Sequence, residues 1–81
     1  MSDAALRAAA LAALRAIAPE VAAEEIAPDQ PLREQVDLDS MDFLNFLIRL
    51  SAATGVDVPE ADYAKLRTLD DLVAYLGARQ H

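Results

Sequence analysis

The chain contains no cysteine and no tryptophan, and its single histidine is the last residue, His81. Without cysteine there is no disulfide framework, no cysteine nucleophile and no thiolate zinc cluster. A terminal residue is seldom held in a fixed position, so His81 is a poor candidate for a catalytic base. Any thiol chemistry in which the protein takes part must therefore use a thiol from another molecule.

Basic residues are also few, because 14 acidic side chains face 7 lysines and arginines and the formal charge is −7. A nucleic-acid binder needs positive charge to neutralise phosphates, so we expect no nucleic-acid partner. Long-range attraction would instead favour a partner protein with a basic surface.

Long apolar runs are missing as well. No stretch approaches the about 18 consecutive apolar residues of a membrane span. The alanine-rich start contains Asp3, Arg7 and Arg15, which favours a helix of the mature protein over a signal peptide. We therefore expect a cytoplasmic protein that does not associate with membranes.

A length of 81 residues leaves room for one domain, residues 1–81, and we expect a monomer. The apolar fraction of 54% is sufficient for a core, and only 5% of residues are aromatic. Much of the apolar content is alanine, which favours closely packed helices over a sheet.

The first predicted helix covers residues 3–18. Ser2 or Asp3 is a suitable N-cap, and Pro19 ends the helix because proline cannot continue the hydrogen-bond ladder. Its apolar residues recur every three or four positions and make one stripe: Leu6, Ala10, Leu14 and Ile17. A long connection of residues 19–38 follows, with three prolines and one expected helical turn near residues 21–25.

The second predicted helix covers residues 40–53, with Asp39 as its N-cap and Gly55 just beyond its end. Apolar side chains cover most of its circumference, so we expect it to be central and packed on several sides. Pro59 begins a short third helix that ends near Leu66, and Thr68 caps a fourth. The predicted fold is all-α, a four-helix bundle with a long first loop and a short third helix.

The segment with chemical potential is Asp37-Leu38-Asp39-Ser40-Met41-Asp42. It places the Ser40 hydroxyl where a loop becomes a helix, near free backbone N–H groups and the positive end of the helix dipole. A phosphate attached to that hydroxyl is favoured there. Asp39 and Asp42 oppose tight binding of free phosphate, so their charge is better suited to docking a basic enzyme.

The run Asp39-Ser40-Met41 resembles the Asp-Ser-Leu/Met motif of the acyl and peptidyl carrier proteins. Residues 55–60 resemble that family's link into the short third helix, and residues 68–76 resemble its last helix. The likeness extends without a gap from Asp37 to Leu76. It implies a carrier-type bundle in which a phosphopantetheinyl transferase attaches 4'-phosphopantetheine covalently to Ser40.

The resemblance implies a discrete carrier that is not an enzyme and has no catalytic or metal-binding residues. Its cargo is an acyl or aminoacyl thioester, which a loading enzyme supplies and other biosynthetic enzymes receive. The residues that we assign to partner docking are Asp37, Asp39, Met41, Asp42, Asn45 and Ile48. The residues that fall where the family lines its cargo cleft are Phe43, Phe46, Leu50, Val58, Tyr63 and Leu66. Phe43 and Tyr63 are large for those places, which predicts a shallow or filled cleft and a short or polar cargo.

One alternative stays open. The chain could be a helical interaction module that has the carrier fold but no 4'-phosphopantetheine arm, and that docks through Met41 and Ile48. Two others fail on their motifs. A calcium loop needs an oxygen ligand and a glycine where Met41 and Asp42 stand. A serine hydrolase of the Gly-x-Ser-x-Gly type needs an elbow and a histidine partner that the chain does not offer.

Overall fold

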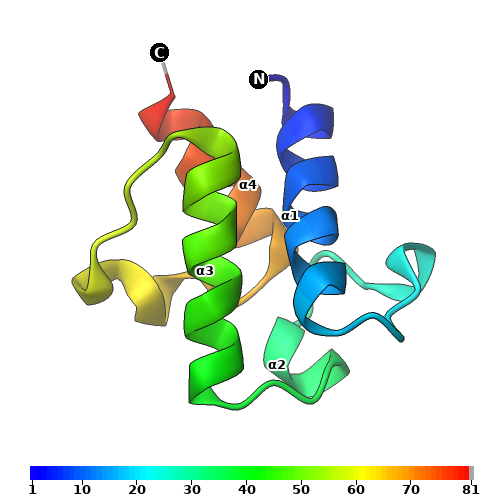
Figure 1. Ribbon diagram of the computed structural model, residues 1–81. Coiled ribbons are helices and arrows are strands. Elements are labelled where there is room, and N and C mark those ends of the chain that lie inside the picture. The colour runs from blue at the N-terminus through cyan, green and yellow to red at the C-terminus, as the bar shows by residue number, and fades with distance from the viewer. Residues whose placement is uncertain (81) are drawn as a thin grey trace.

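The structure, a computed structural model, describes residues 1–80. Three long helices pack side by side, and shorter helical turns lie in their connections (Figure 1). The elements in chain order are α1 (Asp3–Ile17), η1 (Ala23–Glu25), α2 (Leu32–Gln35), α3 (Ser40–Thr54), η2 (Glu60–Lys65) and α4 (Leu69–Arg79). No strand occurs in residues 1–80, so the all-α prediction is confirmed.

Helix α1 forms as its stripe predicts, ending one residue earlier than expected. The Ser2 hydroxyl accepts a hydrogen bond from the Ala5 N–H at 3.1 Å and caps the helix. Leu6, Ala10 and Leu14 are buried, and α1 packs against both α3 and α4. None of the helices in residues 1–80 is long and apolar enough to cross a bilayer.

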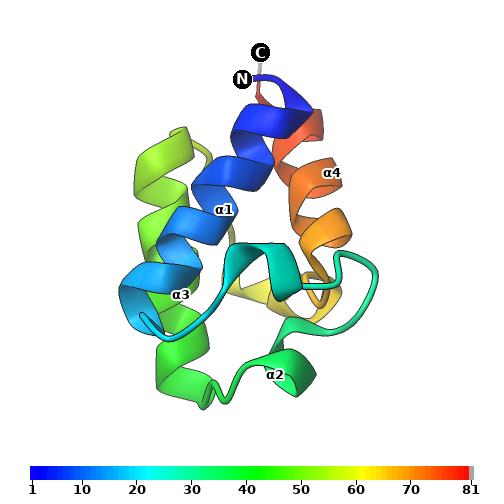
Figure 2. The same cartoon turned by 90° about the vertical axis from the view of Figure 1, so that its right-hand side faces the viewer.

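The connection from α1 to α3 is more ordered than its prolines suggest. The Gln35 side chain binds the Ala27 N–H at 2.7 Å and the carbonyls of Ala27 and Gln30 at 2.9 and 3.0 Å. The Leu32 N–H donates to the Arg67 carbonyl at 2.8 Å, which fastens α2 to the junction of η2 and α4. Figure 2 shows the connection passing from the end of α1 towards the start of α4 before it reaches α3. The turn η1 agrees with prediction, whereas α2 was not predicted.

Both ends of α3 follow the local rules. The Asp39 carboxylate accepts from the Asp42 N–H at 2.8 Å, and the Asp42 carboxylate lies 3.4 Å from the Asp39 N–H, forming a capping box. At the other end Gly55 adopts the left-handed conformation with φ of 72°.

Helix α3 packs against α1 and into the core, and one of its faces is open, the face with the predicted docking residues. Phe46, Leu47 and Leu50 are buried, but Met41 and Ile48 are 64% and 54% exposed. The connection from α3 to α4, residues 55–68 with η2, runs beside α3 (Figure 1), and Met41 and Ile48 remain exposed.

The third helix, η2, is a 3-10 helix, and Pro59 precedes it. A side-chain cluster ties it to α4: the Tyr75 hydroxyl donates to Asp62 at 2.5 Å, and Arg79 lies 3.6 Å from the same carboxylate. Helix α4 begins at the predicted Thr68–Asp71 capping box, in which the Thr68 hydroxyl accepts from the Asp71 N–H at 3.0 Å.

Candidate functional site

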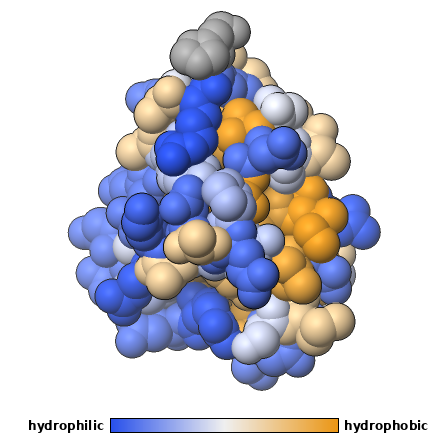
Figure 3. Space-filling model, turned by 90° about the vertical axis from the view of Figure 1, so that its left-hand side faces the viewer, coloured by the Kyte–Doolittle hydropathy of each residue, from blue (hydrophilic) through white to orange (hydrophobic). Residues whose placement is uncertain are grey.

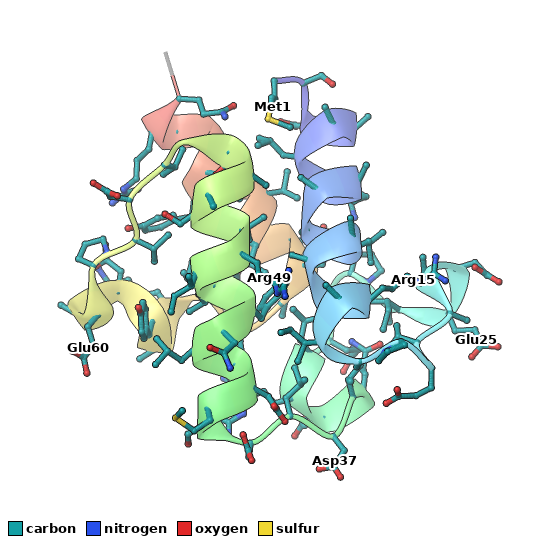
Figure 4. All side chains as sticks on the ribbon, in the orientation of Figure 1. Met1, Arg15, Glu25, Asp37, Arg49 and Glu60 are labelled. Atoms are coloured by element: carbon teal, nitrogen blue, oxygen red, sulfur yellow. The ribbon has the colours of Figure 1, made fainter. Side chains whose placement is uncertain are left out.

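Ser40 is the first residue of α3, and its side chain is exposed. The preceding Asp39 ends the loop in an extended conformation with ψ of −179°, and its carboxylate caps the helix. In Figure 1 this end of α3 lies at the opposite end of the molecule from both termini. Figure 4 shows Asp37 at the same end, with its carboxylate directed outward. The hydroxyl is therefore open to approach by another protein.

The residues assigned to docking lie together at the start and along the open face of α3. Asp37, Asp39, Met41, Asn45 and Ile48 are exposed, and Asp42 is half-buried. Met41, Asn45 and Ile48 follow at helical spacing, so they share one face. The Asp39 and Asp42 carboxylates also form the capping box, which gives them a structural role beside any role in recognition.

An open apolar groove adjoins this face. It has a volume of about 680 Å³ and lies between α3 and the segment leading into η2, with Ile48, Val58 and Tyr63 in its lining. Figure 3 shows apolar residues gathered on this side of the molecule. The groove adjoins the second half of α3, and exposed apolar surface of this kind is typical of a protein interaction site.

The structure separates the six residues assigned to a cargo cleft. Phe46, Leu50 and Leu66 are fully buried and belong to the core shared by the long helices. Phe43, Val58 and Tyr63 are half-buried and line grooves at the surface. The Phe43 and Phe46 rings connect the two groups, with centroids 6.0 Å apart.

Two further grooves meet beside Ser40. The "Ser40 groove", of about 240 Å³, is lined by Arg33, Ser40, Phe43, Leu44, Tyr63 and Ala64. The "arginine groove", of about 370 Å³, lies between α2 and η2 and shares four of these residues with it: Arg33, Phe43, Tyr63 and Ala64. Glu34 and Arg67 also line the arginine groove.

Arg33 was not predicted as a site residue. Its Nε donates to the Leu38 carbonyl at 3.2 Å, and its guanidinium carbon lies 5.7 Å from the centroid of the Phe43 ring. These contacts hold it beside the loop that precedes Ser40. Because α2 has four residues, it has no periodicity that could assign Arg33 to a face, so no sequence pattern identifies this residue.

No group of three or more histidine, cysteine, aspartate or glutamate side chains in residues 1–80 is arranged to hold a metal ion. The site thus consists of an exposed alcohol, a capped helix start, an apolar face and two arginines near a pair of grooves. Such a surface is suited to being modified and bound by other proteins.

Comparison with known proteins agrees with this geometry. The sequence profile described as "Phosphopantetheine attachment site" matches residues 9–76. The meromycolate extension acyl carrier protein of Mycobacterium bovis is 35% identical over 52 residues, which cover 64% of this chain and 45% of the relative. The acyl carrier protein of Rhodococcus erythropolis is 35% identical over 52 residues, covering 64% and 57%. That of Rubrobacter xylanophilus is 29% identical over 56 residues, covering 69% of each chain.

The chain spans about half the length of several of these relatives. The matched profile covers most of the chain, and its members hold 4'-phosphopantetheine covalently on a serine. They are carriers on which other enzymes act, so the expectation of a non-catalytic role agrees with the match. The chain belongs to the phosphopantetheine attachment site family, the family of the acyl carrier proteins.

Proposed function

We propose that Ser40 is the serine to which the 4'-phosphopantetheine arm is attached, and that the protein is a carrier of acyl or aminoacyl thioesters. The chain has three serines, at positions 2, 40 and 51. Ser2 lies outside the matched residues 9–76 and caps α1. Ser51 is half-buried, and its hydroxyl donates to the Val56 carbonyl at 2.6 Å. The exposure of Ser40 at the start of α3 is the observation on which the proposal depends.

The residues around Ser40 fit a phosphodiester on its oxygen. The first turn of a helix presents backbone N–H groups that have no carbonyl partner within the helix, and these favour an anion. The Asp39–Asp42 capping box holds that turn in place. When bound, the arm supplies a terminal thiol, which explains how a chain without cysteine takes part in thioester chemistry.

We propose a short or polar cargo because the side chains at the family's cleft positions themselves fill the space that a long cargo would need. Phe46, Leu50 and Leu66 fill the core, and Phe43 and Tyr63 stand at its surface. The grooves near Ser40 are open to solvent, and a long alkyl chain in them would keep part of its surface in water. The names of the mycobacterial relatives describe meromycolate extension, and this chain is proposed to differ from them in its cargo.

For partners, we propose a phosphopantetheinyl transferase, a loading enzyme and downstream acyl-transfer enzymes. The acidic residues Asp37, Asp39 and Asp42 would meet basic groups of these enzymes, and Met41 and Ile48 would meet apolar ones. A cytoplasmic monomer remains our prediction. The alternative of an interaction module without an arm is not favoured by the family match.

The test is incubation of the purified protein with coenzyme A and a transferase of broad specificity, followed by intact mass measurement. We expect the wild type and Ser51→Ala to gain the mass of one phosphopantetheine group, and Ser40→Ala to gain none. Circular dichroism of the variants checks that all three proteins are folded. Modification of Ser40→Ala, or none of the folded wild type, contradicts the proposal.

A further inference from the structure

We propose that the arginine groove holds the free carboxylate of an acidic acyl cargo, such as a dicarboxylic acid joined to the arm through one of its two carboxyl groups. This inference rests on the proposed function, because the cargo reaches the groove only on an arm attached at Ser40. It goes further by naming the class of cargo and the two residues that recognise it, Arg33 and Arg67.

The two arginines are placed by contacts at both walls of the groove. The backbone hydrogen bond from Leu32 N–H to the Arg67 carbonyl, at 2.8 Å, brings the start of α2 beside the end of η2. Arg33 follows Leu32 directly, and its Nε is fixed on the Leu38 carbonyl. This bond uses one donor, so the terminal N–H groups of the guanidinium remain for a ligand.

The lining of the arginine groove is basic, whereas the whole molecule is acidic. Of the seven basic side chains, Arg7, Lys65 and Arg79 form ion pairs with aspartates. Arg33 and Arg67 form none within residues 1–80, yet both line the same groove in a chain of net charge −7. Glu34 is the one carboxylate among its lining residues, so their formal charges sum to +1, and the Asp71 carboxylate next to it accepts from the Arg67 backbone N–H at 3.3 Å.

The position of the groove connects it to the arm. The Ser40 groove and the arginine groove share Arg33 and three other lining residues, so a continuous surface leads from Ser40 to the guanidinium groups. Phe43 and Tyr63 form an apolar wall along this path. A short acyl group can lie against this wall while its terminal carboxylate pairs with the arginines, an arrangement in which guanidinium is an effective partner.

The test compares two cargoes of equal carbon number. A transferase of broad specificity loads ¹⁵N-labelled protein from succinyl- or butyryl-coenzyme A, and mass spectrometry verifies the loading. We expect the succinyl form to shift the amide signals of Arg33, Ala64 and Arg67 and the Arg33 Nε–H signal, relative to both the butyryl and the cargo-free arm. An exposed ion pair should make the groove-bound state of the succinyl cargo about two- to fivefold more populated than that of the butyryl cargo. The shifts should shrink at high salt.

In Arg33→Gln/Arg67→Gln, the Ala64 amide and the amides of positions 33 and 67 should show no difference between the succinyl and butyryl forms. The charge-matched control is Arg15→Gln/Arg49→Gln, since these exposed arginines line neither groove. Figure 4 shows Arg15 at the end of α1, on the other side of α3 from η2. The control should retain the shifts.

Equal shifts for both cargoes, or shifts already complete with the arm alone, would overturn the inference and assign the arginines to the arm itself. In both cases the proposed function stands, because loading has occurred. Failure of the folded wild type to load removes the proposed function and this inference with it.

Discussion

At the scale of single residues, Asp39 combines two roles that a substitution can separate. Its carboxylate caps α3, and its charge lies beside the serine proposed as the site of modification. Asparagine at this position can accept the same hydrogen bond but has no charge. Alanine has neither the hydrogen-bond acceptor nor the charge.

We therefore expect Asp39→Ala to lower the free energy of unfolding by about 1 kcal/mol and Asp39→Asn to change it by only a few tenths. Both variants should be modified by a basic transferase more slowly, by about two- to fivefold, the scale of a surface charge pair. Urea unfolding and initial rates of modification measure the two effects. Equal stability of the two variants would show that the cap is not needed.

The two glycines are a second residue-scale case, and they predict opposite effects. Gly55 has φ of 72°, and a Cβ there would meet no atom within 4 Å, so only backbone strain opposes Gly55→Ala. We expect this variant to lose about 1–2 kcal/mol of unfolding free energy. Gly77 lies within α4, and its Cβ would lie at an ordinary 3.7 Å from Leu6. Gly77→Ala should gain about 0.5–1 kcal/mol. Urea unfolding of the two variants decides; a stabilising Gly55→Ala contradicts the account.

At the scale of elements, η2 is held to α4 by the Asp62–Tyr75–Arg79 cluster. The hydrogen bond from the Tyr75 hydroxyl, with Lys65 and Arg79 nearby, lowers the pKa of Asp62 below its ordinary value of 3.8. The same hydrogen bond raises the pKa of Tyr75 above 10.0. The cluster is thus intact at neutral pH.

The lowered pKa of Asp62 and the raised pKa of Tyr75 predict how the free energy of unfolding depends on pH. The contribution of Asp62 is present above its unfolded pKa and is lost as the pH falls through the lowered, folded pKa. The contribution of Tyr75 is present below pH 10 and is lost as the pH rises through the raised pKa. The stability difference between wild type and Tyr75→Phe should therefore be constant between about pH 5 and 9 and shrink at both extremes. Urea unfolding across pH measures it; a difference that changes around pH 7 contradicts it.

The elements that sequence predicts well are those with a long apolar stripe or a distinct cap. Residues 3–17 have the stripe, and Asp39, Thr68 and Gly55 mark helix ends through hydrogen bonds or conformations specific to those residue types. The short helix α2 lacks both signals, because it is held by the tertiary hydrogen bonds of Gln35 and Leu32. Arg33 and the grooves beside Ser40 depend on that docking, so they could not be read from the sequence.

At the scale of the whole molecule, the charge of −7 is a source of self-repulsion. Sodium chloride should screen it and raise the midpoint of thermal unfolding, because isolated surface pairs such as Arg7–Asp70 lose little in return. A gain of about 1 kcal/mol corresponds to about 4–8 °C in a domain of this size. Calorimetry at low salt and at half-molar salt tests this; a lower midpoint in salt contradicts it.

The division of apolar residues between the core and the surface is also decided at the scale of the whole molecule, and the sequence does not reveal it. The family pattern places Phe46, Leu50 and Leu66 together with Phe43, Val58 and Tyr63, but the packing of three long helices buries the first three completely. Which apolar residues remain at the surface depends on how closely the helices pack, and no local pattern of residues specifies that distance. The open face of α3, with Met41 and Ile48, has the same origin.

The most direct test of the central claim is a tryptic map of the wild-type protein after reaction with coenzyme A and a transferase. Cleavage after Arg33 and Arg49 releases residues 34–49, in which Ser40 is the only serine, while Ser51 falls in the next peptide. We predict that the phosphopantetheine mass lies on the 34–49 peptide alone. Its presence on any other peptide, or an unmodified 34–49 peptide from the folded protein, would contradict the account.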